Sequence, residues 1–409
     1  MKKINLTLTA LLLLVFSACK LDTIEKIEFF IDYPNSFHSE RINAKNPEIK
    51  KTSPVLRKNI IFESPAAEPD WILTAYAPKP ESIAIGNFPD LAVDAQGNIH
   101  IVYNRGGLKY KRYLANSGTW TNEYDVGCTC ENLNRSDPDI VVDSKGNPHV
   151  FCGKEYAYFD GKKWHKSIPG GNRDTELAID ANDRLYLISR GGNNGGHIGL
   201  TSKANAEEEW LALNDPDKKN KGFNDHVYPD LFIGKDGQIH IVQRHGPSVE
   251  VTYRRSIDGG STWPLEEAVS NERSESPHIV VDGAGNVYIA TGDGSVFERK
   301  KEKWSFIGRK LYSSSRMQPE WGIDDQDNLY LACFGGRYNT RHKSVWMGER
   351  IIEPITSGKQ IGFVETAGHK DFSYIIWEEG IGNADEGLGD DARIVIGILY
   401  PDGRIAGFN

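Results

Sequence analysis

The chain lacks several features that define large classes of protein. It has no excess of positive charge: its 409 residues carry 48 Lys and Arg against 57 Asp and Glu, a formal net charge of -9. Non-specific nucleic-acid binding therefore has no electrostatic support, and an acidic polysaccharide could bind only in a locally basic pocket. Few stretches show helical periodicity. The 41 Gly, 19 Pro, 17 Tyr and 9 Trp instead describe a globular protein rich in turns and aromatic strands.

The only long apolar run, Leu6 to Phe16, is too short for a stable transmembrane span. It follows a positively charged start and precedes Ser17-Ala18-Cys19, a small-residue cleavage site that ends in cysteine. The segment resembles a bacterial lipoprotein signal, which implies that Cys19 is lipidated and that the chain is anchored in the outer membrane or the periplasm by this lipid alone. The alternative is an ordinary secretory signal. We expect a signal peptide over 1–18, a lipidated tether over 19–53 and a single domain over 54–409.

Cysteine is scarce beyond the signal. An exported chain permits disulfides, and a bridge from Cys128 or Cys130 to Cys152 is expected if these residues are neighbours. A metal site at Cys128-Thr129-Cys130 would need further ligands that the sequence does not supply, and we predict no metal and no cofactor. Cys333 lies inside an apolar stretch and is expected to be a buried thiol.

One unit repeats along the chain: an apolar strand, a D-x-x-G-N turn and a second apolar strand. Two clear copies are FPDLAVDAQGNIHIVY from Phe88 and YPDLFIGKDGQIHIVQ from Tyr228. The copies begin roughly 40 to 50 residues apart, which is typical of propeller blades. Asp and Gly at the reversal tolerate the left-handed backbone of tight hairpins. Six copies are evident, beginning at Phe88, Asp137, Thr175, Tyr228, Ser276 and Gln318.

A seventh, weaker copy begins at Gly362 and keeps only the second strand. Most hairpins are followed by a third strand and a Trp, so the pattern predicts four strands in each blade. Because one such sheet cannot bury both faces alone, the blades must stack radially. We predict an all-β, seven-bladed β-propeller with four-stranded antiparallel blades, with six or eight blades as alternatives. Either the strand from Arg393 to Tyr400 or the segment from Asn59 to Tyr76 is expected to close the ring.

The residues from Ser256 to Trp263, SIDGGSTW, match the Asp-box of sialidase-type propellers, S-x-D-x-G-x-T-W. This motif indicates the fold. It is expected to shape a hairpin away from the usual active face and to have no catalytic role.

The candidate site lies where each inner strand starts and the next strand ends, because these positions meet at one end of the axis. Arginine is enriched there, which suits bidentate recognition of carboxylate or sulfate. The alternative is that these arginines pair with acids of the same ring. The positions are Asn87, Arg105, Arg135, Lys154, Arg173, Arg190, His226, Tyr228, Arg244, His245, Glu275, Asp293, Arg316, Arg337, Glu378 and Glu379.

The histidines fall into two groups. His100, His149 and His240 occupy the same early position of the second strand in three repeats, so we expect them to be structural, as is His278 in an inner strand. His226 and His245 break the repeat pattern. They are 19 residues apart, one hairpin up and back, and histidine is the usual side chain for proton transfer near neutral pH. His197, after a Gly-rich loop, is a further candidate near the same mouth.

The D-H-x-x-P start of this blade, its D-x-x-G turn and the x-H end of its second strand resemble the histidine-bearing blade of seven-bladed propellers that act on ulvan, the ulvan lyase and oligo-ulvan dehydratase group. In that group two histidines act with a tyrosine and an arginine. The resemblance implies His226 and His245, with Arg337 as the arginine. The family's tyrosine position holds Ser276 or Gln318 here, so Tyr228 and Tyr338 are the substitutes.

The resemblance implies a β-elimination at a uronic acid. An arginine would stabilise the enolate-like charge, a His or Tyr would take the C5 proton, and a protonated group would assist the oxygen that leaves C4. A leaving sugar defines a lyase and leaving water a dehydratase. The alternatives are a sialidase- or rhamnosidase-type glycoside hydrolase, although no R-I-P motif is present, and a noncatalytic glycan-binding lipoprotein. The expected partner is an acidic oligosaccharide or polysaccharide, contacted by Arg105, Arg173, Arg190, Arg244, Tyr338 and His197.

Overall fold

The computed structural model describes residues 78–130, 138–169, 173–191, 197–213, 226–245, 250–270, 276–311, 318–382 and 388–408, with two short strands before them. The chain divides into two units, Met1–Tyr76 and Ala77–Asn409. In the first, β1 (Glu28–Phe29) pairs with β2 (Ile60–Ile61) in antiparallel fashion. Cys19 and the predicted signal peptide lie outside the described residues. Within the described part, no helix is both long enough and apolar enough to cross a membrane.

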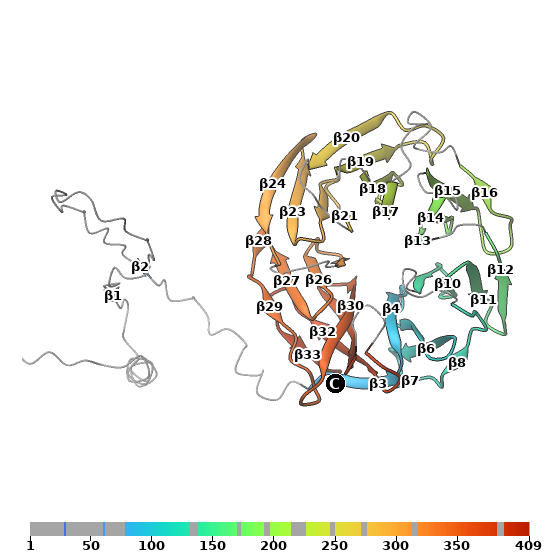
Figure 1. Ribbon diagram of the computed structural model, residues 1–409, viewed down its shortest axis with the longest axis vertical. Helices are drawn as coiled ribbons and strands as arrows, with labels where there is room; N and C mark the ends of the chain where they lie inside the picture. The colour runs from blue at the N-terminus through green and yellow to red at the C-terminus, as the bar shows by residue number, and fades with distance from the viewer. Residues whose placement is uncertain are drawn as a thin grey trace, which may run out of the picture. The chain divides into compact units, whose positions relative to one another are not determined.

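The second unit is a seven-bladed β-propeller of four-stranded antiparallel blades, as the repeat predicts (Figure 1). Each blade runs outward from an inner strand, and the inner strands surround the axis. Short extra strands β8 (Tyr124–Asp125), β29 (Arg350–Ile351) and β33 (Ile405–Ala406) add to blades 1, 6 and 7.

From the axis outward, the strands of blades 1 to 3 are β4 (Asn87–Val93), β5 (Ile99–Asn104), β6 (Leu108–Leu114) and β7 (Thr119–Trp120); β9 (Asp139–Val142), β10 (Pro148–Cys152), β11 (Glu155–Phe159) and β12 (Trp164–Ser167); and β13 (Arg173–Ile179), β14 (Leu185–Gly191), β15 (His197–Lys203) and β16 (Leu211–Ala212).

Blades 4 to 6 consist of β17 (His226–Ile233), β18 (Ile239–His245), β19 (Val251–Ser256) and β20 (Leu265–Ser270); β21 (His278–Val281), β22 (Val287–Ala290), β23 (Ser295–Lys300) and β24 (Lys303–Arg309); and β25 (Pro319–Ile323), β26 (Leu329–Cys333), β27 (Arg337–His342) and β28 (Val345–Trp346).

Blade 7 closes the ring by combining both ends of the unit. Its strands are β30 (Gln360–His369), β31 (Phe372–Gly380) and β32 (Arg393–Leu399), and its outer strand is β3 (Glu81–Ile85). The expected C-terminal strand is therefore present. The N-terminal partner is the segment immediately before the first repeat, not Asn59–Tyr76, because β3 pairs with β32 in the register Glu81↔Ile396.

Aromatic side chains from outer strands fill the spaces between blades. Trp164 of blade 2 packs edge-on against Tyr110 of blade 1, with ring centroids 5.3 Å apart. Trp304 of blade 5 meets Tyr253 of blade 4 in the same way, at 5.4 Å. Such edge-to-face pairs add to the stabilisation from buried area. The aromatic residues that follow each hairpin thus join neighbouring blades.

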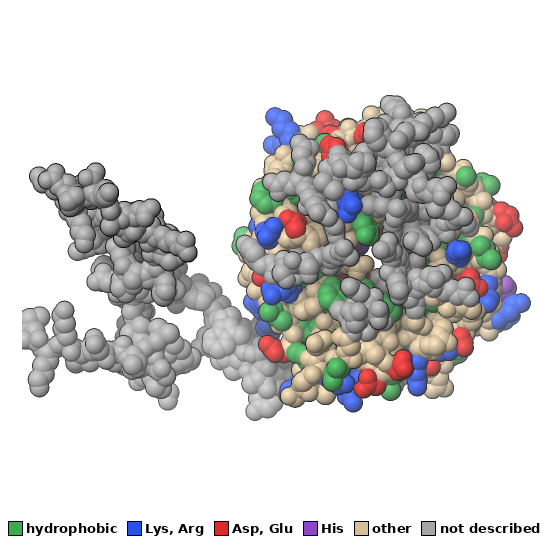
Figure 2. All heavy atoms as spheres, viewed as in Figure 1, with side chains coloured by type: hydrophobic (Ala, Val, Ile, Leu, Met, Phe, Trp, Pro, Cys, Tyr) green, Lys and Arg blue, Asp and Glu red, His purple; other side chains and the backbone are tan. Residues whose placement is uncertain are grey.

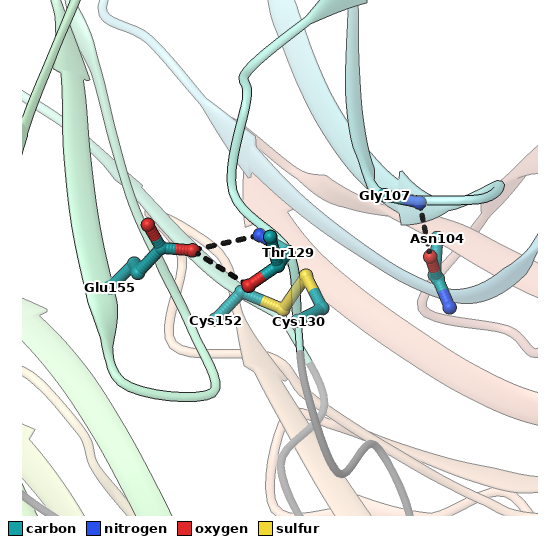
Figure 3. The surroundings of a disulfide bond; sticks show 6 residues. All are labelled: Asn104, Gly107, Thr129, Cys130, Cys152 and Glu155. Atoms are coloured by element: carbon teal, nitrogen blue, oxygen red, sulfur yellow. Dashed lines mark hydrogen bonds between the residues drawn. A yellow bond between two sulfur atoms is a disulfide. The ribbon is translucent and has the colours of Figure 1, made fainter.

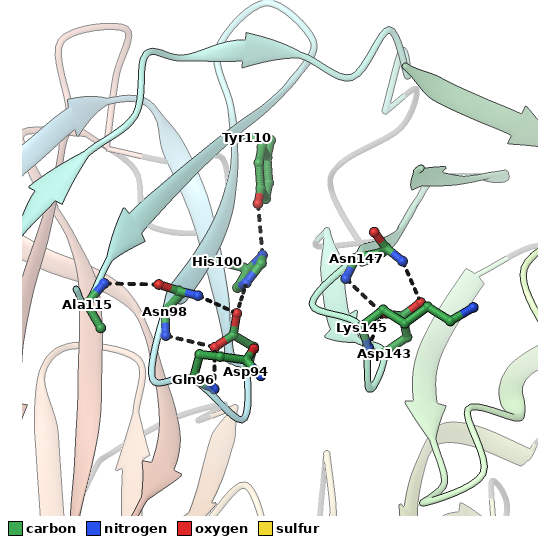
Figure 4. A network of polar contacts seen from close by, with 9 residues as sticks. All are labelled: Asp94, Gln96, Asn98, His100, Tyr110, Ala115, Asp143, Lys145 and Asn147. Atoms are coloured by element: carbon green, nitrogen blue, oxygen red, sulfur yellow. Dashed lines mark hydrogen bonds and ion pairs between the residues drawn. The ribbon is translucent and has the colours of Figure 1, made fainter. Parts of the chain in front are cut away.

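The D-x-x-G-N turns are organised by their first aspartate (Figure 4). In blade 1 a carboxylate oxygen of Asp94 accepts hydrogen bonds from the backbone N–H groups of Gln96 and Asn98, at 2.9 and 2.8 Å. Gly97 adopts the positive φ of 82° that this turn requires. The same arrangement recurs at Asp143 in blade 2. We name this end of the propeller the hairpin face and the opposite end the mouth.

The Asp-box of blade 4 lies at the hairpin face, between β19 and β20. Asp258 accepts hydrogen bonds from the Thr262 backbone N–H at 2.8 Å and from its hydroxyl at 2.6 Å. Ser256 accepts one from the Gly260 N–H at 2.9 Å. The motif therefore shapes a turn, as the sequence indicates, and it lies at the far end of the blade from His226 and His245.

Candidate functional site

The strand register places His226 and His245 directly opposite each other at the mouth of blade 4, where β17 begins and β18 ends. Residues opposite each other in an antiparallel pair have Cα atoms about 4.5–5.5 Å apart. The next pair is Val227 with Arg244. The side chains of His226 and His245 lie outside the described residues, so their backbone register is the observation that joins them.

Tyr228 lies beside this pair because β17 bulges there. The register shifts between Val227 and Asp230, so that Tyr228 and Pro229 on the inner strand lie opposite the single residue Gln243 on β18. Tyr228 has a positive φ of 53° and is half-buried. Its ring centroid lies 5.6 Å from the guanidinium carbon of Arg244, a cation–π contact. A phenol and a guanidinium thus adjoin the two histidines.

The neighbouring blade 3 brings three further candidates to the same end of the propeller. Arg173 is the cross-strand partner of Arg190, and Gly191 is the partner of His197. The side chains of these three candidates lie outside the described residues, and their roles stay predictions.

Arg105 of blade 1 follows β5, and its side chain is 53% exposed with Nη1 3.6 Å from Glu123 Oε2. Glu123 also accepts a hydrogen bond from Tyr103 at 2.5 Å. Arg105 therefore has an acidic neighbour in its own blade. This contact agrees with the alternative that such arginines pair with acidic residues of the protein itself.

Two candidates in blade 6 lie differently from the expectation. Arg337 does not end the second strand: β26 ends at Cys333, and Arg337 begins β27 after a Gly335-Gly336 turn. Its Nη1 donates to Glu349 Oε1 at 2.9 Å. Tyr338 is 5% exposed.

The hydroxyl of Tyr338 donates to the backbone oxygen of Gly403, at 3.0 Å, in the hairpin between β32 and β33. That bond gives Tyr338 a role in joining blades 6 and 7, and its burial is unfavourable for a ligand contact.

Acidic residues of the ring fasten loops. Glu378 and Glu379, at the mouth of blade 7, are both fully buried. Glu378 accepts from the backbone N–H of Phe88 in blade 1 at 3.1 Å, and burial raises the pKa of Glu378. Glu379 accepts from the backbone N–H of Thr356 at 2.8 Å. In the same ring, Arg135, Glu275 and Arg316 lie outside the described residues.

The predicted disulfide joins Cys130 to Cys152 and connects the segment after blade 1 to the mouth end of β10 (Figure 3). Beside it, Glu155 accepts hydrogen bonds from both the backbone N–H and the hydroxyl of Thr129, at 2.8 and 3.1 Å. Cys128 and Cys333 are buried thiols outside any disulfide, in agreement with the expectation for Cys333.

The repeat-position histidines are structural. In blade 1 the fully buried His100 bridges Asp94, at 3.2 Å from Nε2, and the Tyr110 hydroxyl, at 2.8 Å from Nδ1 (Figure 4). Burial opposes the charge on Asp94, but hydrogen bonds from His100 and Asn98 lower the pKa of Asp94 to about 2. His149 and His240 make the same contact to Tyr156 and Tyr253, at 2.6 and 2.8 Å.

A ring of acidic residues at one repeat position was not recognised from the sequence. The Asp90 carboxylate accepts from the backbone N–H of Ile140 in blade 2, at 2.8 Å, and Asp230 does the same for Ile279 in blade 5, at 2.6 Å. Burial raises the pKa of each aspartate. The shared feature, an acid four residues before the first position of the turn in five of the blades, was visible in the repeat. Its members are Asp90, Asp139, Glu176, Asp230 and Glu320.

Charge on the face of the propeller seen in Figure 2 is mixed, with acidic and basic side chains of the described residues interspersed. An acidic ligand would therefore be held by particular residues and not by a general basic field. Across the residues that the structure describes, no group of three or more His, Cys, Asp or Glu side chains could hold a metal ion.

Neither a family model nor a curated protein matches the chain. Solved structures share its fold. The β-propeller domain of Cps50 (Swd1) from Myceliophteria thermophila superposes with a TM-score of 0.54 at 8% identity, over 77% of this chain and 98% of that one.

The polysaccharide lyase Uly1 superposes with a TM-score of 0.53 at 12% identity, over 80% of this chain and 92% of that one. The hydrazine synthase of Kuenenia stuttgartiensis gives 0.51 at 11% identity, over 77% of this chain and 96% of that one. At such identities the likeness concerns the fold alone: the chain is similar to β-propellers of several unrelated activities.

Proposed function

We propose that the chain is a β-eliminating enzyme that acts on uronic-acid residues of ulvan-type acidic oligosaccharides and forms a 4,5-unsaturated uronate. The observation that carries this proposal is the register pairing of His226 with His245 at the mouth of blade 4. Histidine is the usual side chain for proton transfer near neutral pH, and two histidines at facing strand positions suit the transfer of one proton from C5 and another to the leaving oxygen.

The neighbouring side chains supply the remaining roles. One histidine takes the C5 proton, the C5–H electrons form the C4–C5 double bond, and the C4–O bond breaks. The second histidine or the Tyr228 phenol protonates the leaving oxygen. Arg244, beside Tyr228, pairs with the substrate carboxylate and stabilises the enolate-like charge. We assign this role to Arg244 because it lies in the same blade as the histidine pair, whereas Arg337 lies in blade 6.

The fold gives weaker support. Uly1, which shares the propeller at 12% identity, is named as a polysaccharide lyase. Propellers host many unrelated functions, so this likeness is an analogy, and the histidine pair is the stronger argument.

The experiment is incubation of the full chain with uronate-containing oligosaccharides, following the absorbance of the unsaturated uronate and the mass of the products. Shorter products indicate a lyase, and loss of water indicates a dehydratase. We expect His226→Ala and His245→Ala to abolish the signal. His165→Ala, in blade 2, is the matched control because His165 is 34% exposed and paired with Asp160.

Three outcomes would contradict the proposal. The first is an unchanged rate in both histidine variants. The second is release of reducing ends without an unsaturated product, which indicates a glycoside hydrolase. The third is glycan binding without turnover that persists in both variants, which indicates a glycan-binding lipoprotein.

We also propose that Cys19 carries the lipid that anchors the chain in the outer membrane or the periplasm. Replacing Cys19 with Ser should move the protein from the membrane fraction to the soluble fraction of the expressing cells. Retention of the variant in the membrane fraction would contradict this anchor.

A further inference from the structure

A groove of about 590 Å³ crosses the hairpin face, at the opposite end of the blades from the histidine pair. Its walls come from three blades: Lys300 ends β23 of blade 5, Lys343 and Ser344 form the β27–β28 hairpin of blade 6, and Tyr400 follows β32 of blade 7. Sites for small ligands typically enclose about 300–1,000 Å³. The groove has the size of such a site.

The floor of the groove is fixed by buried polar contacts. The Tyr288 hydroxyl, in blade 5, donates toward Asp282 at 3.2 Å and accepts from Arg341 Nη1 of blade 6 at 2.8 Å. The Arg341 guanidinium carbon also lies 4.8 Å from the Tyr288 ring centroid. Asp282 in turn holds its own hairpin through the Asn286 N–H, at 2.8 Å. A ligand would therefore meet a preorganised surface, which lowers the cost of binding.

The hairpin of blade 7 is equally fixed. Thr340 donates to the Pro401 backbone oxygen at 2.8 Å, and Arg350 donates to the Gly403 oxygen at 2.7 Å. The wall that carries Tyr400 is thus tied to blade 6.

Most acids of the groove already have donors. Asp402 accepts from Arg404 Nε at 2.6 Å, and Asp327 accepts from the Gly283 N–H at 2.8 Å. Lys300 and Lys343 are exposed, and their ammonium groups form no hydrogen bond or ion pair with any residue that the structure describes. Two exposed carboxylates line the groove: Asp402, which is paired with Arg404, and Asp371, which stands against these two ammonium groups. The binding capacity that remains is mainly cationic.

We infer that this groove is a second binding site, for an acidic glycan segment, separate from the histidine pair. Lys300 and Lys343 receive its sulfate or carboxylate groups. Gln326 and Ser344, which also line the groove, provide polar groups for sugar hydroxyls. A recessed groove with amide, hydroxyl and tyrosine side chains suits a polyhydroxylated chain better than a flat membrane surface.

The test measures binding by calorimetry with three probes: chondroitin sulfate oligosaccharides, unsulfated chondroitin oligosaccharides and neutral dextran. All measurements use the full chain carrying His226→Ala and His245→Ala, so that the outcome does not depend on the proposed reaction. We expect an acidic probe to bind and dextran not to bind. Adding Lys300→Gln and Lys343→Gln should weaken binding about tenfold, since charge-assisted hydrogen bonds are lost.

The matched control is Lys162→Gln with Lys163→Gln, which removes two exposed charges from the β11–β12 hairpin of blade 2. It should leave the affinity within about twofold, since surface charges outside a site contribute little. Equal weakening by both double variants, unchanged binding in the groove variant, or tighter binding of dextran would overturn the inference. So would loss of binding to anionic phospholipid vesicles in the groove variant with no loss of glycan binding.

Discussion

Blades 1 and 4 share one scaffold and differ at their two ends. Both inner strands bulge at the mouth, and the bulged residues Phe88 and Tyr228 have the same φ of 53°. Both bulges precede an aspartate that bonds the next blade, Asp90 or Asp230. The bulge and the aspartate that bonds the next blade are therefore the same in both blades. The remaining differences between the two blades are those specific to blade 4.

At the mouth, blade 1 carries a buried aromatic side chain, whereas blade 4 carries polar side chains. Phe88 is 4% exposed and packs on Phe363, with centroids 4.7 Å apart, whereas Tyr228 is half-buried beside Arg244. The counterpart of His226 is Gly86, where an added Cβ would lie 2.6 Å from the Tyr103 ring. Blade 1 has no room for a histidine there, so the pair is a feature of blade 4 and not of the repeat.

At the hairpin face, blade 4 has lost a contact. Asp94 of blade 1 corresponds to Gly234, and the turn of blade 4 is instead capped by Asp236, which accepts from the Gln238 N–H at 3.0 Å. Within the part of the chain that the structure describes, His240 contacts Tyr253 through Nδ1 and its Nε2 has no hydrogen-bond partner, whereas His100 contacts both Asp94 and Tyr110. This difference lies at the end without the proposed chemistry, and it should affect stability alone.

The largest expected effect separates the two kinds of histidine in blade 4. His226→Ala or His245→Ala should reduce turnover of uronate oligosaccharides about 10²–10⁴-fold, the usual contribution of general acid–base catalysis. Thermal unfolding should be unchanged, since both residues lie at the mouth ends of their strands. His240→Ala should do the reverse, with lower stability and normal specific activity in the folded fraction. Normal turnover in both the His226→Ala and the His245→Ala variants would contradict a catalytic role for this pair.

The next effect compares the structural histidines. His100→Ala leaves Asp94 and Tyr110 without their buried partner and should lower the free energy of unfolding by about 3 kcal/mol. His240→Ala removes one such contact and should lower it by about 2 kcal/mol. Urea unfolding at neutral pH measures both. Equal losses of unfolding free energy in the two variants would indicate that the His100–Asp94 contact does not stabilise the fold.

Lowering the pH should reveal the contribution of His240 to the free energy of unfolding. Burial lowers the pKa of His240 to about 4, below its ordinary value, so the folded state binds fewer protons than the unfolded chain. The stability that depends on neutral His240 is complete above about pH 6.5 and should fall by about 3 kcal/mol as the pH drops to about 4. His240→Gln should remove this dependence. The difference between wild-type and variant unfolding curves isolates it from the buried aspartates, and parallel curves would contradict it.

A reciprocal exchange tests the mouth. Tyr228→Phe should slow turnover about tenfold with no loss of stability, if the phenol assists proton transfer. Phe88→Tyr should instead cost about 1–3 kcal/mol of stability, because a hydroxyl is buried against Phe363. Kinetics and thermal unfolding on the same two proteins give the answer. A Tyr228→Phe enzyme with full activity would restrict the chemistry to the histidines.

The smallest expected effect repairs the hairpin of blade 4. Gly234→Asp together with Asp236→Gln recreates the turn of blade 1, with a carboxylate within reach of His240. Gly234→Asp alone would place its Cβ 2.6 Å from Asp236 Oδ1, so the second change is needed. The pair should raise stability by about 1 kcal/mol and raise the pKa of His240, as Asp94 opposes the lowering at His100. Histidine titration by NMR measures the second effect.

The sequence was sufficient where a feature repeats. Position within the repeat predicts the seven blades, the turn aspartates and the structural role of His100. It does so because the same positions pack in the same way in most blades. The pairing of His226 with His245 follows from hairpin length. The ring acids Asp90 and Asp230 also recur at one repeat position. Their role was not predicted, because the sequence does not show that an inner-strand acid accepts a hydrogen bond from the neighbouring blade.

The sequence was insufficient where a residue's partner is distant in the chain. Nothing local shows that Glu81 pairs with Ile396, or that Tyr338 reaches Gly403. Arg337 was placed one strand too early because the Gly335-Gly336 turn that reverses the chain resembles a strand end. The choice of Cys130 over Cys128 also depended on which thiol faces Cys152.

The closure of blade 7 has a consequence for how the ring is made. Strand β3 is synthesised before every repeat, and its partner β32 is synthesised after the inner two strands of blade 7. The first strand of the propeller therefore remains without this partner until blade 7 has been synthesised. A chain interrupted after blade 6 would carry an open edge on both sides, and such edges bind other strands. We therefore expect these edges to be exposed to other strands until blade 7 closes the ring.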